Sequence, residues 1–249
     1  PTDFSIKRGQ CAYVPTGGKV PNGTEAMVMR EETKDLGDGF IQFERSYAVK
    51  LNLILRGEDM KPGTIVEPAG KRLKIADIGT LAAMGLLTVP VMKRPRVALI
   101  STGDELVPAT EPVLQIGQIR DVNSPMLYQA ILANGGEPQL YGIVKDDYNV
   151  IRSSILTAIA NCDLLLISGG TSIDEKDILA DILSEVGKVF VHGIRIKPGK
   201  PTILASIQGK PVMGMPGNPV SAYFIFHLLV RPLLASLQGT TVVERKVTL

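Results

Sequence analysis

Carboxylate side chains follow three of the apolar, strand-like runs in the second half of the chain. Asp104 and Glu105 come after the first of these runs, Asp146 after the second and Asp177 after the third. Carboxylate oxygens on separate loops are the ligands that Mg²⁺ prefers, and bound Mg²⁺ often bridges to substrate phosphates. One acidic loop alone is usually just a solvated surface, but three of them together predict a cation site.

Glycines, hydroxyls and lysines occupy the loops after the same runs and after two further ones. Backbone N–H groups in Gly-rich loops and at helix starts can bind anions, and lysines on a proline-stiffened loop add positive charge. The candidate substrate-binding residues are Ser101, Thr102, Gly103, Ser168, Gly169, Gly170, Thr171, Ser172, Lys197, Lys200, Pro216, Gly217, Asn218, Pro219 and Ser221. Each loop taken alone could be a tight turn, a helix cap or a solvated surface. Together with the carboxylates, the loops predict a small-molecule site that binds phosphate.

Alternating strands and helices must position these loops. The predicted strands are residues 97–100, 140–144, 164–167, 189–191, 203–205 and 212–215. The predicted helices begin near Asn123 and cover residues 150–160, 177–186 and 218–237. This alternation predicts an α/β fold: a mainly parallel, three-layer α/β sheet domain with right-handed crossovers. Because the C-termini of parallel strands lie on one edge of an open sheet, we expect the loops to converge there.

The first part of the chain has a different pattern. Residues 26–29, 40–44 and 48–55 are predicted to be short strands between turn signals. Residues 75–84 have helical spacing and end at Gly85, a natural helix C-cap. We therefore expect residues 1–60 to be part of a β-rich domain, residues 61–93 to be a linker with a helix, and residues 94–240 to form the α/β domain.

Composition argues against several classes of function. The 249 residues carry a net charge of +2, only 5% aromatic residues and no Trp, so no nucleic-acid or membrane partner is expected. The apolar run 220–237 is interrupted by polar residues and predicts a buried core helix. The Walker pattern GxxxxGK[ST] and the Rossmann pattern GxGxxG are missing, which disfavours ordinary NTPases and dehydrogenases.

The cysteines and histidines do not suggest a metal or catalytic site. Cys11 and Cys162 are expected to be free thiols of a reducing compartment, so we expect a cytoplasmic protein. His192 and His227 are too far apart in sequence to indicate a zinc site, and neither has a placed catalytic partner.

In their order along the chain, these residues resemble the molybdopterin molybdenumtransferase family, which is related to the E domain of gephyrin. The matching segments are residues 15–18, 21–29, 56–59, 77–79, 101–106, 121–124, 146–147, 168–172, 197–201 and 216–222. The resemblance spans nearly the whole chain, although Ser-Gly-Gly-Thr-Ser at 168–172 is shared with the family's adenylyltransferase relatives. It further implies that residues 241–249 are the start of a carboxy-terminal β-domain.

The resemblance implies a transferase that inserts molybdate into adenylylated molybdopterin, with Mg²⁺-dependent release of AMP. Carried over position by position, the family's functional residues fall on Thr16, Glu105, Asp146, Asp177 and Lys197, with Pro216 and Pro219 shaping the site. Asp104, Glu105, Asp146 and Asp177 are then the expected Mg²⁺ ligands. A homodimer is also implied, with a molybdopterin adenylyltransferase as a candidate partner.

Departures from the family pattern leave two other interpretations open. Asp174 stands where the family usually has Gly, and Gly193 stands where some members have Lys. The family's amino-terminal segment and most of its carboxy-terminal β-domain have no counterpart in these 249 residues. A non-catalytic molybdopterin-binding or scaffold protein would fit these departures. A molybdopterin adenylyltransferase that uses ATP is disfavoured by the β-rich segment around Thr16 and Gly17.

Overall fold

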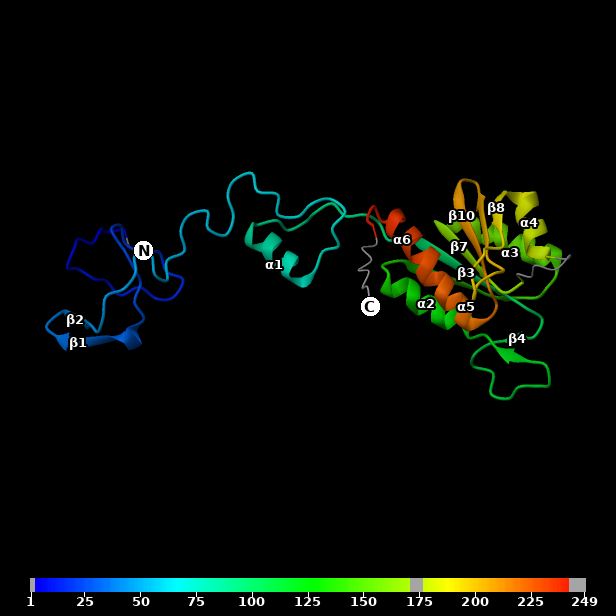
Figure 1. The fold of residues 1–249 in the computed structure, drawn as a ribbon, viewed down its shortest axis with the longest axis horizontal. Helices are drawn as coiled ribbons and strands as arrows, with labels where there is room; N and C mark the ends of the chain where they lie inside the picture. The colour runs from blue at the N-terminus through cyan, green and yellow to red at the C-terminus, as the bar shows by residue number, and fades with distance from the viewer. Residues whose placement is uncertain (1–2, 171–176, 242–249) are drawn as a thin grey trace. The chain divides into compact units, whose positions relative to one another are not determined.

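The computed structural model describes residues 3–170 and 177–241. The chain forms two compact units, Pro1–Val66 and Glu67–Leu249, here called the N-terminal unit and the α/β unit (Figure 1). Their boundary falls inside the stretch 61–93 that was predicted to be a linker. Each unit is described by itself.

The N-terminal unit contains a short hairpin and many turns. A 3₁₀ helix, η1 (Arg30–Glu32), precedes the antiparallel strands β1 (Thr33–Gly37) and β2 (Phe40–Phe43). The prediction of a strand near residues 40–44 is confirmed, but those at 26–29 and 48–55 are wrong. Lys50 and Asn52 have positive φ angles of 70° and 54°, which an extended strand cannot contain.

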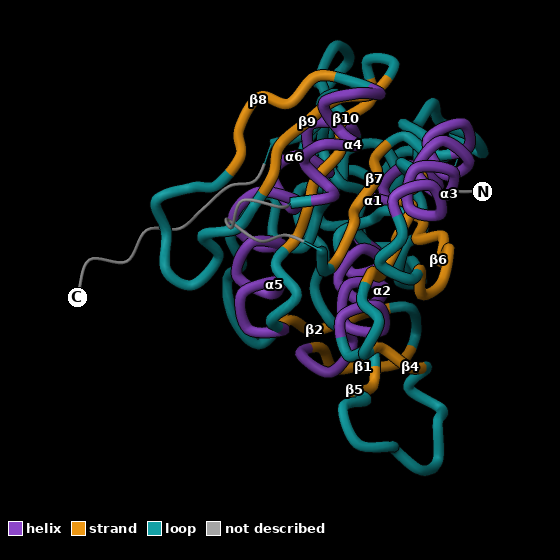
Figure 2. Tube along the Cα trace, turned by 90° about the vertical axis from the view of Figure 1, so that its right-hand side faces the viewer, coloured by secondary structure: helices purple, strands orange, loops and turns teal. Residues whose placement is uncertain are grey.

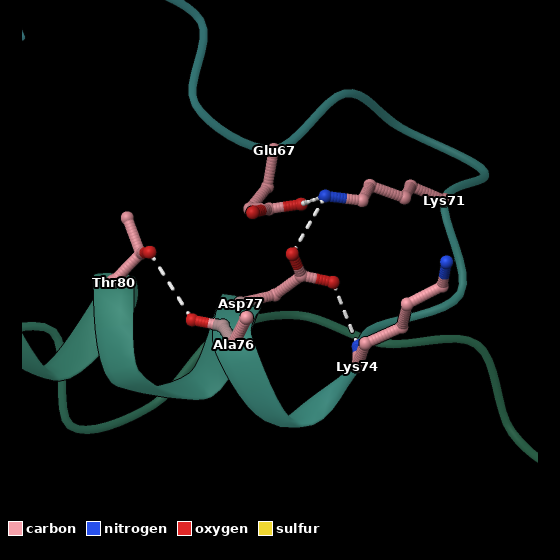
Figure 3. Close-up of polar contacts among 6 residues, drawn as sticks. All are labelled: Glu67, Lys71, Lys74, Ala76, Asp77 and Thr80. Atoms are coloured by element: carbon pink, nitrogen blue, oxygen red, sulfur yellow. Dashed lines mark hydrogen bonds and ion pairs between the residues drawn. The ribbon is translucent and has the colours of Figure 1, made fainter.

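The α/β unit begins with the predicted helix α1 (Ile75–Ala83). Figure 3 shows the polar cluster at its start. Lys71 Nζ lies 2.8 Å from Asp77 Oδ1 and 2.6 Å from Glu67 Oε2, and the Lys74 N–H donates to Asp77 Oδ2 at 2.7 Å. The pKa of Lys71 is raised, mainly because its ammonium group forms a hydrogen bond with Asp77. The cluster therefore fixes the point at which the helix begins.

A six-stranded sheet, ordered β6-β3-β7-β10-β9-β8, forms the centre of the α/β unit. Its strands are β3 (Arg96–Thr102), β6 (Glu137–Val144), β7 (Leu164–Ser168), β8 (Lys188–His192), β9 (Ile203–Ile207) and β10 (Lys210–Met215). Strands β6, β3, β7 and β10 run parallel, whereas β9 is antiparallel to β10 and to β8. The predicted α/β class with a mainly parallel sheet is confirmed.

The antiparallel pair β9–β10 has a local cause. Only Gln208 and Gly209 connect the two strands, and both have positive φ angles, 52° and 76°. Two such residues make a tight hairpin, whereas a parallel neighbour needs a crossover of about a dozen residues or more.

Helices cover both faces of the sheet, as Figure 2 shows. One face packs against α3 (Tyr148–Asn161) and α4 (Ile178–Val186). The other packs against α2 (Asn123–Ala133) and a continuous helix made of α5 (Pro219–Ile225), the π-helical turn η2 (Phe226–Val230) and α6 (Arg231–Leu237). Strand β7 is apolar throughout because Leu164 and Leu166 face one layer while Leu165 and Ile167 face the other.

The helix Pro219–Leu237 is, within residues 3–170 and 177–241, the one helix long and apolar enough to cross a membrane by length and composition. Ile225, Phe226 and Val230 are buried against the sheet, which supports the predicted core helix. The helix is not buried all round, however, because Tyr223 and Phe224 on its outer side are 49% and 51% exposed.

Strand β1 in the N-terminal unit and two short strands of the α/β unit were not predicted. Strands β4 (Leu106–Val107) and β5 (Ile119–Arg120) pair in parallel outside the main sheet. Two-residue strands carry no alternation of polar and apolar residues that a sequence pattern could reveal.

Candidate ligand site at the carboxyl edge of the sheet

The strand register places the predicted loops at one edge of the sheet. Thr102 at the end of β3 pairs with Val144 at the end of β6, and Ser168 at the end of β7 pairs with Met215 at the end of β10. His192 at the end of β8 reaches the same edge through its pairing with the first residue of β9. The loops after these strands therefore start side by side, as the parallel arrangement requires.

Two glycines at the end of β7 lie directly against Thr102. Gly169 and Gly170 have φ angles of 94° and 64°, a region that favours glycine. A Cβ atom on Gly169 would lie 2.2 Å from Thr102 O, and one on Gly170 would lie 2.7 Å from Thr102 Oγ1. Only glycine fits here, so the loop brings its backbone against the end of β3.

The hydroxyl of Thr102 is buried beneath this loop. Thr102 is 2% exposed, and no residue that the structure describes forms a hydrogen bond with its Oγ1 atom. A buried hydroxyl without a partner is unfavourable, so this atom is a candidate contact for a ligand group that enters the loop.

Asn123, at the start of α2, connects the loops that follow β7 and β10. Its Nδ2 donates to Ser168 Oγ at 2.7 Å and to the carbonyl of Gly217 at 2.8 Å. Asn123 is 6% exposed, and its Oδ1 has no partner within the described part of the chain. Asn123 is not among the site residues predicted from the sequence, although it lies in the matching segment 121–124.

Asp121 and Ser124 hold the start of α2 against β3. Asp121 Oδ2 accepts a hydrogen bond from Ser101 Oγ at 2.8 Å, and Asp121 Oδ1 accepts one from the N–H of Ser124 at 3.0 Å. Ser101, a predicted substrate-binding residue, is 1% exposed, and its hydroxyl is used within the junction between β3 and α2.

Asn218 is the N-cap of α5. Its Oδ1 accepts hydrogen bonds from the N–H groups of Val220 at 3.0 Å and Ser221 at 3.2 Å. Pro219 is the first helical residue, as the sequence predicted. Two of the N–H groups that an anion could have used are thus occupied by the cap.

The carboxylates of the first two acidic loops lie near one another. The N–H of Asp146 donates to Asp104 Oδ1 at 3.3 Å. Burial raises the pKa of Asp146, and the charges of Asp104 and Glu105 raise it further. The carboxylates of Asp104, Glu105 and Asp146 thus repel one another, and a bound cation would reduce this repulsion. Carboxylates are also the ligands that Mg²⁺ prefers.

The carboxylates do not form a finished metal centre by themselves. Among residues 3–170 and 177–241, no group of three or more His, Cys, Asp or Glu side chains is arranged so that it could hold a metal ion. Substrate oxygens and water would have to complete the coordination of Mg²⁺ at this edge, which is common for this ion.

Asp177 is fixed by two contacts. Its Oδ1 accepts a hydrogen bond from the N–H of Ala180 at 3.1 Å and so caps α4, and its Oδ2 lies 3.0 Å from His192 Nε2. The expectation that His192 lacks a placed partner is therefore wrong. It failed because the contact joins the end of β8 to the start of α4, which no local spacing reveals.

Lys197 and Lys200 are exposed on the loop between β8 and β9. Neither ammonium group forms a hydrogen bond or an ion pair with the described residues. The hydroxyl of Thr202 donates to the carbonyl of Gly199 at 2.7 Å, and the N–H of Ile194 donates to the carbonyl of Lys200 at 2.9 Å. The loop thus presents two positive charges that have no partner among the described residues, at the edge that carries Asp104, Glu105 and Asp146.

Some predicted residues cannot be placed at this edge. Thr16 belongs to the N-terminal unit. Thr171, Ser172 and Asp174 lie outside the described residues. Gly193 has a φ angle of 83°, which explains why glycine suits the position where some members of the resembled family have Lys.

Known proteins with the same sequence pattern were found for both units. Residues 98–236 match the model of a probable molybdopterin binding domain, and residues 1–85 match the MoeA N-terminal region, domains I and II. A molybdopterin molybdenumtransferase from Nostoc sp. is 36% identical over 240 residues, which cover 95% of this chain and 55% of the relative. One from Haemophilus influenzae is 36% identical over 226 residues, covering 91% and 56%.

A solved structure agrees with these matches. The molybdopterin biosynthesis MoeA protein from Pyrococcus horikosii aligns with a TM-score of 0.78 at 37% identity, over 96% of this chain and 59% of that one. The present chain thus spans just over half the length of these relatives. Because the molybdopterin binding model covers more than half of the chain and the second model covers its beginning, the chain belongs to the MoeA family.

Proposed function

We propose that the carboxyl edge of the sheet binds adenylylated molybdopterin and that the chain acts as a molybdopterin molybdenumtransferase, which inserts molybdate and releases AMP. One observation carries the proposal. The backbone of Gly169 and Gly170, together with Lys197 and Lys200, lies at the same edge as the carboxylates of Asp104, Glu105 and Asp146, where the pKa of Asp146 is raised. A substrate with phosphate groups and a divalent cation would satisfy both kinds of charge.

In this proposal the residues divide between two tasks. Lys197 and Lys200 bind the phosphate oxygens or molybdate as point charges, and the loop at Gly169 and Gly170 lets the ligand approach the backbone. Asp104, Glu105, Asp146 and Asp177 would share Mg²⁺ with substrate oxygens and water, or would orient water toward the phosphoanhydride. Bound Mg²⁺ would offset the phosphate charge that develops as AMP leaves.

The test is calorimetric titration of adenylylated molybdopterin into the chain, with and without Mg²⁺, followed by addition of molybdate and measurement of AMP. We expect Mg²⁺-dependent binding and AMP release. Lys197→Ala should bind at least about tenfold more weakly, since about 1.4 kcal/mol of lost interaction is tenfold in affinity. Lys188→Ala is the matched control, because Lys188 lies at the opposite end of β8.

Each contrary outcome has a distinct meaning. Absence of binding by the wild type would overturn the proposal, and wild-type affinity in Lys197→Ala would remove Lys197 from the site. Binding without AMP release would favour the non-catalytic molybdopterin-binding alternative. Formation of pyrophosphate from ATP and molybdopterin would instead indicate a molybdopterin adenylyltransferase.

We also propose that the chain forms a homodimer in the cytoplasm and receives its substrate from a molybdopterin adenylyltransferase. Exposed apolar side chains on α5, including Tyr223 and Phe224, support an interface between copies, and the free thiols of Cys11 and Cys162 suit a reducing compartment. Light scattering should give a dimer mass for the wild type and a smaller mass for Phe224→Glu. A monomeric wild type would contradict the dimer.

A further inference from the structure

The side chain of Asn123 has an unusual position between the loops of the candidate site. It is 6% exposed, and the two hydrogens of its Nδ2 atom have two acceptors, Ser168 Oγ at 2.7 Å and the Gly217 carbonyl at 2.8 Å. Ser168 is the last residue of β7, and Gly217 follows the last residue of β10 by two positions. One planar amide therefore joins the end of β7 to the turn that follows β10.

The two loops are also in direct contact where Asn123 joins them. A Cβ atom on Gly217 would lie 3.6 Å from the Cα atom of Gly169, and the N–H of Gly169 donates to the carbonyl of Met215 at 3.2 Å. A change at Asn123 that shifted Gly217 would therefore also disturb Gly169.

The bond to Ser168 also directs the hydroxyl of that residue. Ser168 Oγ accepts the hydrogen bond from Asn123, so its own proton has to point to another acceptor. Ser168 is 4% exposed and precedes Gly169. A phosphate or molybdate oxygen in the glycine loop would be such an acceptor.

The remaining atom of the amide points to the same conclusion. Asn123 Oδ1 is buried, and no residue within 3–170 and 177–241 forms a hydrogen bond with it. Burying an amide oxygen without a donor is unfavourable. Both donors of the amide are used while its oxygen is not, which suits a side chain whose N–H groups do the positioning.

We propose that Asn123 is a positioning residue of the ligand site, which joins the loops after β7 and β10 and holds Ser168 as a hydrogen-bond donor toward a bound oxyanion. The inference rests on the proposed function. It assigns a role to a neutral, buried side chain that lies outside the charged groups of the site.

The experiment compares Asn123→Asp, Asn123→Leu and Asn134→Asp with the wild type, by titration of adenylylated molybdopterin. Asn134 is the matched control, because its Nδ2 donates to a backbone carbonyl, that of Ala130 at 2.8 Å, at the other end of α2. Both Asn123 variants should bind about tenfold more weakly or worse at neutral pH, since each has lost donors inside a buried junction. The control should bind like the wild type.

A pH series separates positioning from general damage to the fold. As the pH falls toward the pKa of the new carboxyl, about 4 or higher for a buried Asp, Asn123→Asp gains one O–H donor. Its affinity relative to the wild type at the same pH should then recover. Asn123→Leu, which has no donor at any pH, should not recover.

The outcomes distinguish this inference from the proposed function. Absence of binding by the wild type would overturn both. Wild-type affinity in both Asn123 variants would overturn the positioning role alone. Weak binding by Asn123→Asp with full affinity in Asn123→Leu would show that the new charge alone is responsible, and would also overturn it.

Discussion

Asp177 Oδ2 and His192 Nε2 lie 3.0 Å apart, although the two residues are 15 positions apart in the chain. The contact joins the N-cap of α4 to the end of β8. The other carboxylate oxygen of Asp177 caps α4, so the two oxygens have different partners and the orientation of the carboxylate is fixed. His192 is thus a natural candidate for the residue that orients Asp177.

Replacement of His192 tests this relationship. His192→Ala should free one oxygen of Asp177 and slow AMP release from adenylylated molybdopterin several-fold. The melting temperature should also fall, because the side chain of Asp177 is only 3% exposed and leaving a buried carboxylate oxygen without its partner costs about 1–3 kcal/mol. His192→Gln keeps a donor and should retain more activity than His192→Ala. Equal rates in His192→Ala and the wild type would contradict the orienting role.

Gly169 should tolerate no side chain. Its φ angle is 94°, and an added Cβ would lie 2.2 Å from Thr102 O, so Gly169→Ala adds a clash to a conformational cost. Gly209 has a φ angle of 76° and no atom within 4 Å of such a Cβ, so Gly209→Ala measures the conformational cost alone, about 1–2 kcal/mol.

Urea unfolding should therefore show a larger loss of stability for Gly169→Ala than for Gly209→Ala. Gly169→Ala should also lose affinity for adenylylated molybdopterin, because the loop can no longer lie against β3. Equal losses of stability in the two variants would contradict the close approach of Gly169 to Thr102.

The raised pKa of Asp146 predicts a pH-dependent effect on stability. Burial and the charges of Asp104 and Glu105 make the folded protein bind this proton more tightly than the unfolded chain does. The contribution of Asp146 is therefore most favourable below its unfolded pKa, about 3.9, and is lost as the pH rises through the raised folded pKa. Asp146→Asn should raise the melting temperature at neutral pH, and the gain should shrink in acid.

Thermal unfolding across a pH series measures this difference. Asp59→Asn is a suitable control, because Asp59 is exposed in the N-terminal unit and lies outside the acidic cluster. A melting temperature of Asp146→Asn at or below that of the wild type at neutral pH would show that the carboxylate is not repelled by its neighbours.

The two thiols should differ sharply in reactivity. Cys11 is exposed, whereas Cys162 is buried, and its burial raises the pKa of its thiol. A chromogenic disulfide reagent should therefore modify one thiol per chain in the native protein and both in denaturant. Cys11→Ser should abolish the native reaction. Rapid modification of both thiols in native wild type would contradict the burial of Cys162.

The sequence by itself determined the class of the fold and the edge at which its loops converge. Strands such as β7 are buried on both faces, so they are continuous apolar runs that are recognisable without a structure. Turn residues ended the runs, and the order of the motifs indicated the family. The N-terminal unit was predicted less well, because the run at 48–55 alternates polar and apolar residues yet contains Lys50 and Asn52 in a left-handed conformation.

Only the tertiary structure decided which of these loops are tied together. Asn123 binds partners 45 and 94 positions away, and no spacing in the sequence encodes such distances. Its role, like that of His192, depends on strand order, which brings the ends of β3, β7 and β10 together. Periodicity records which face of an element is buried, whereas the partner of a polar side chain is set by how the elements pack.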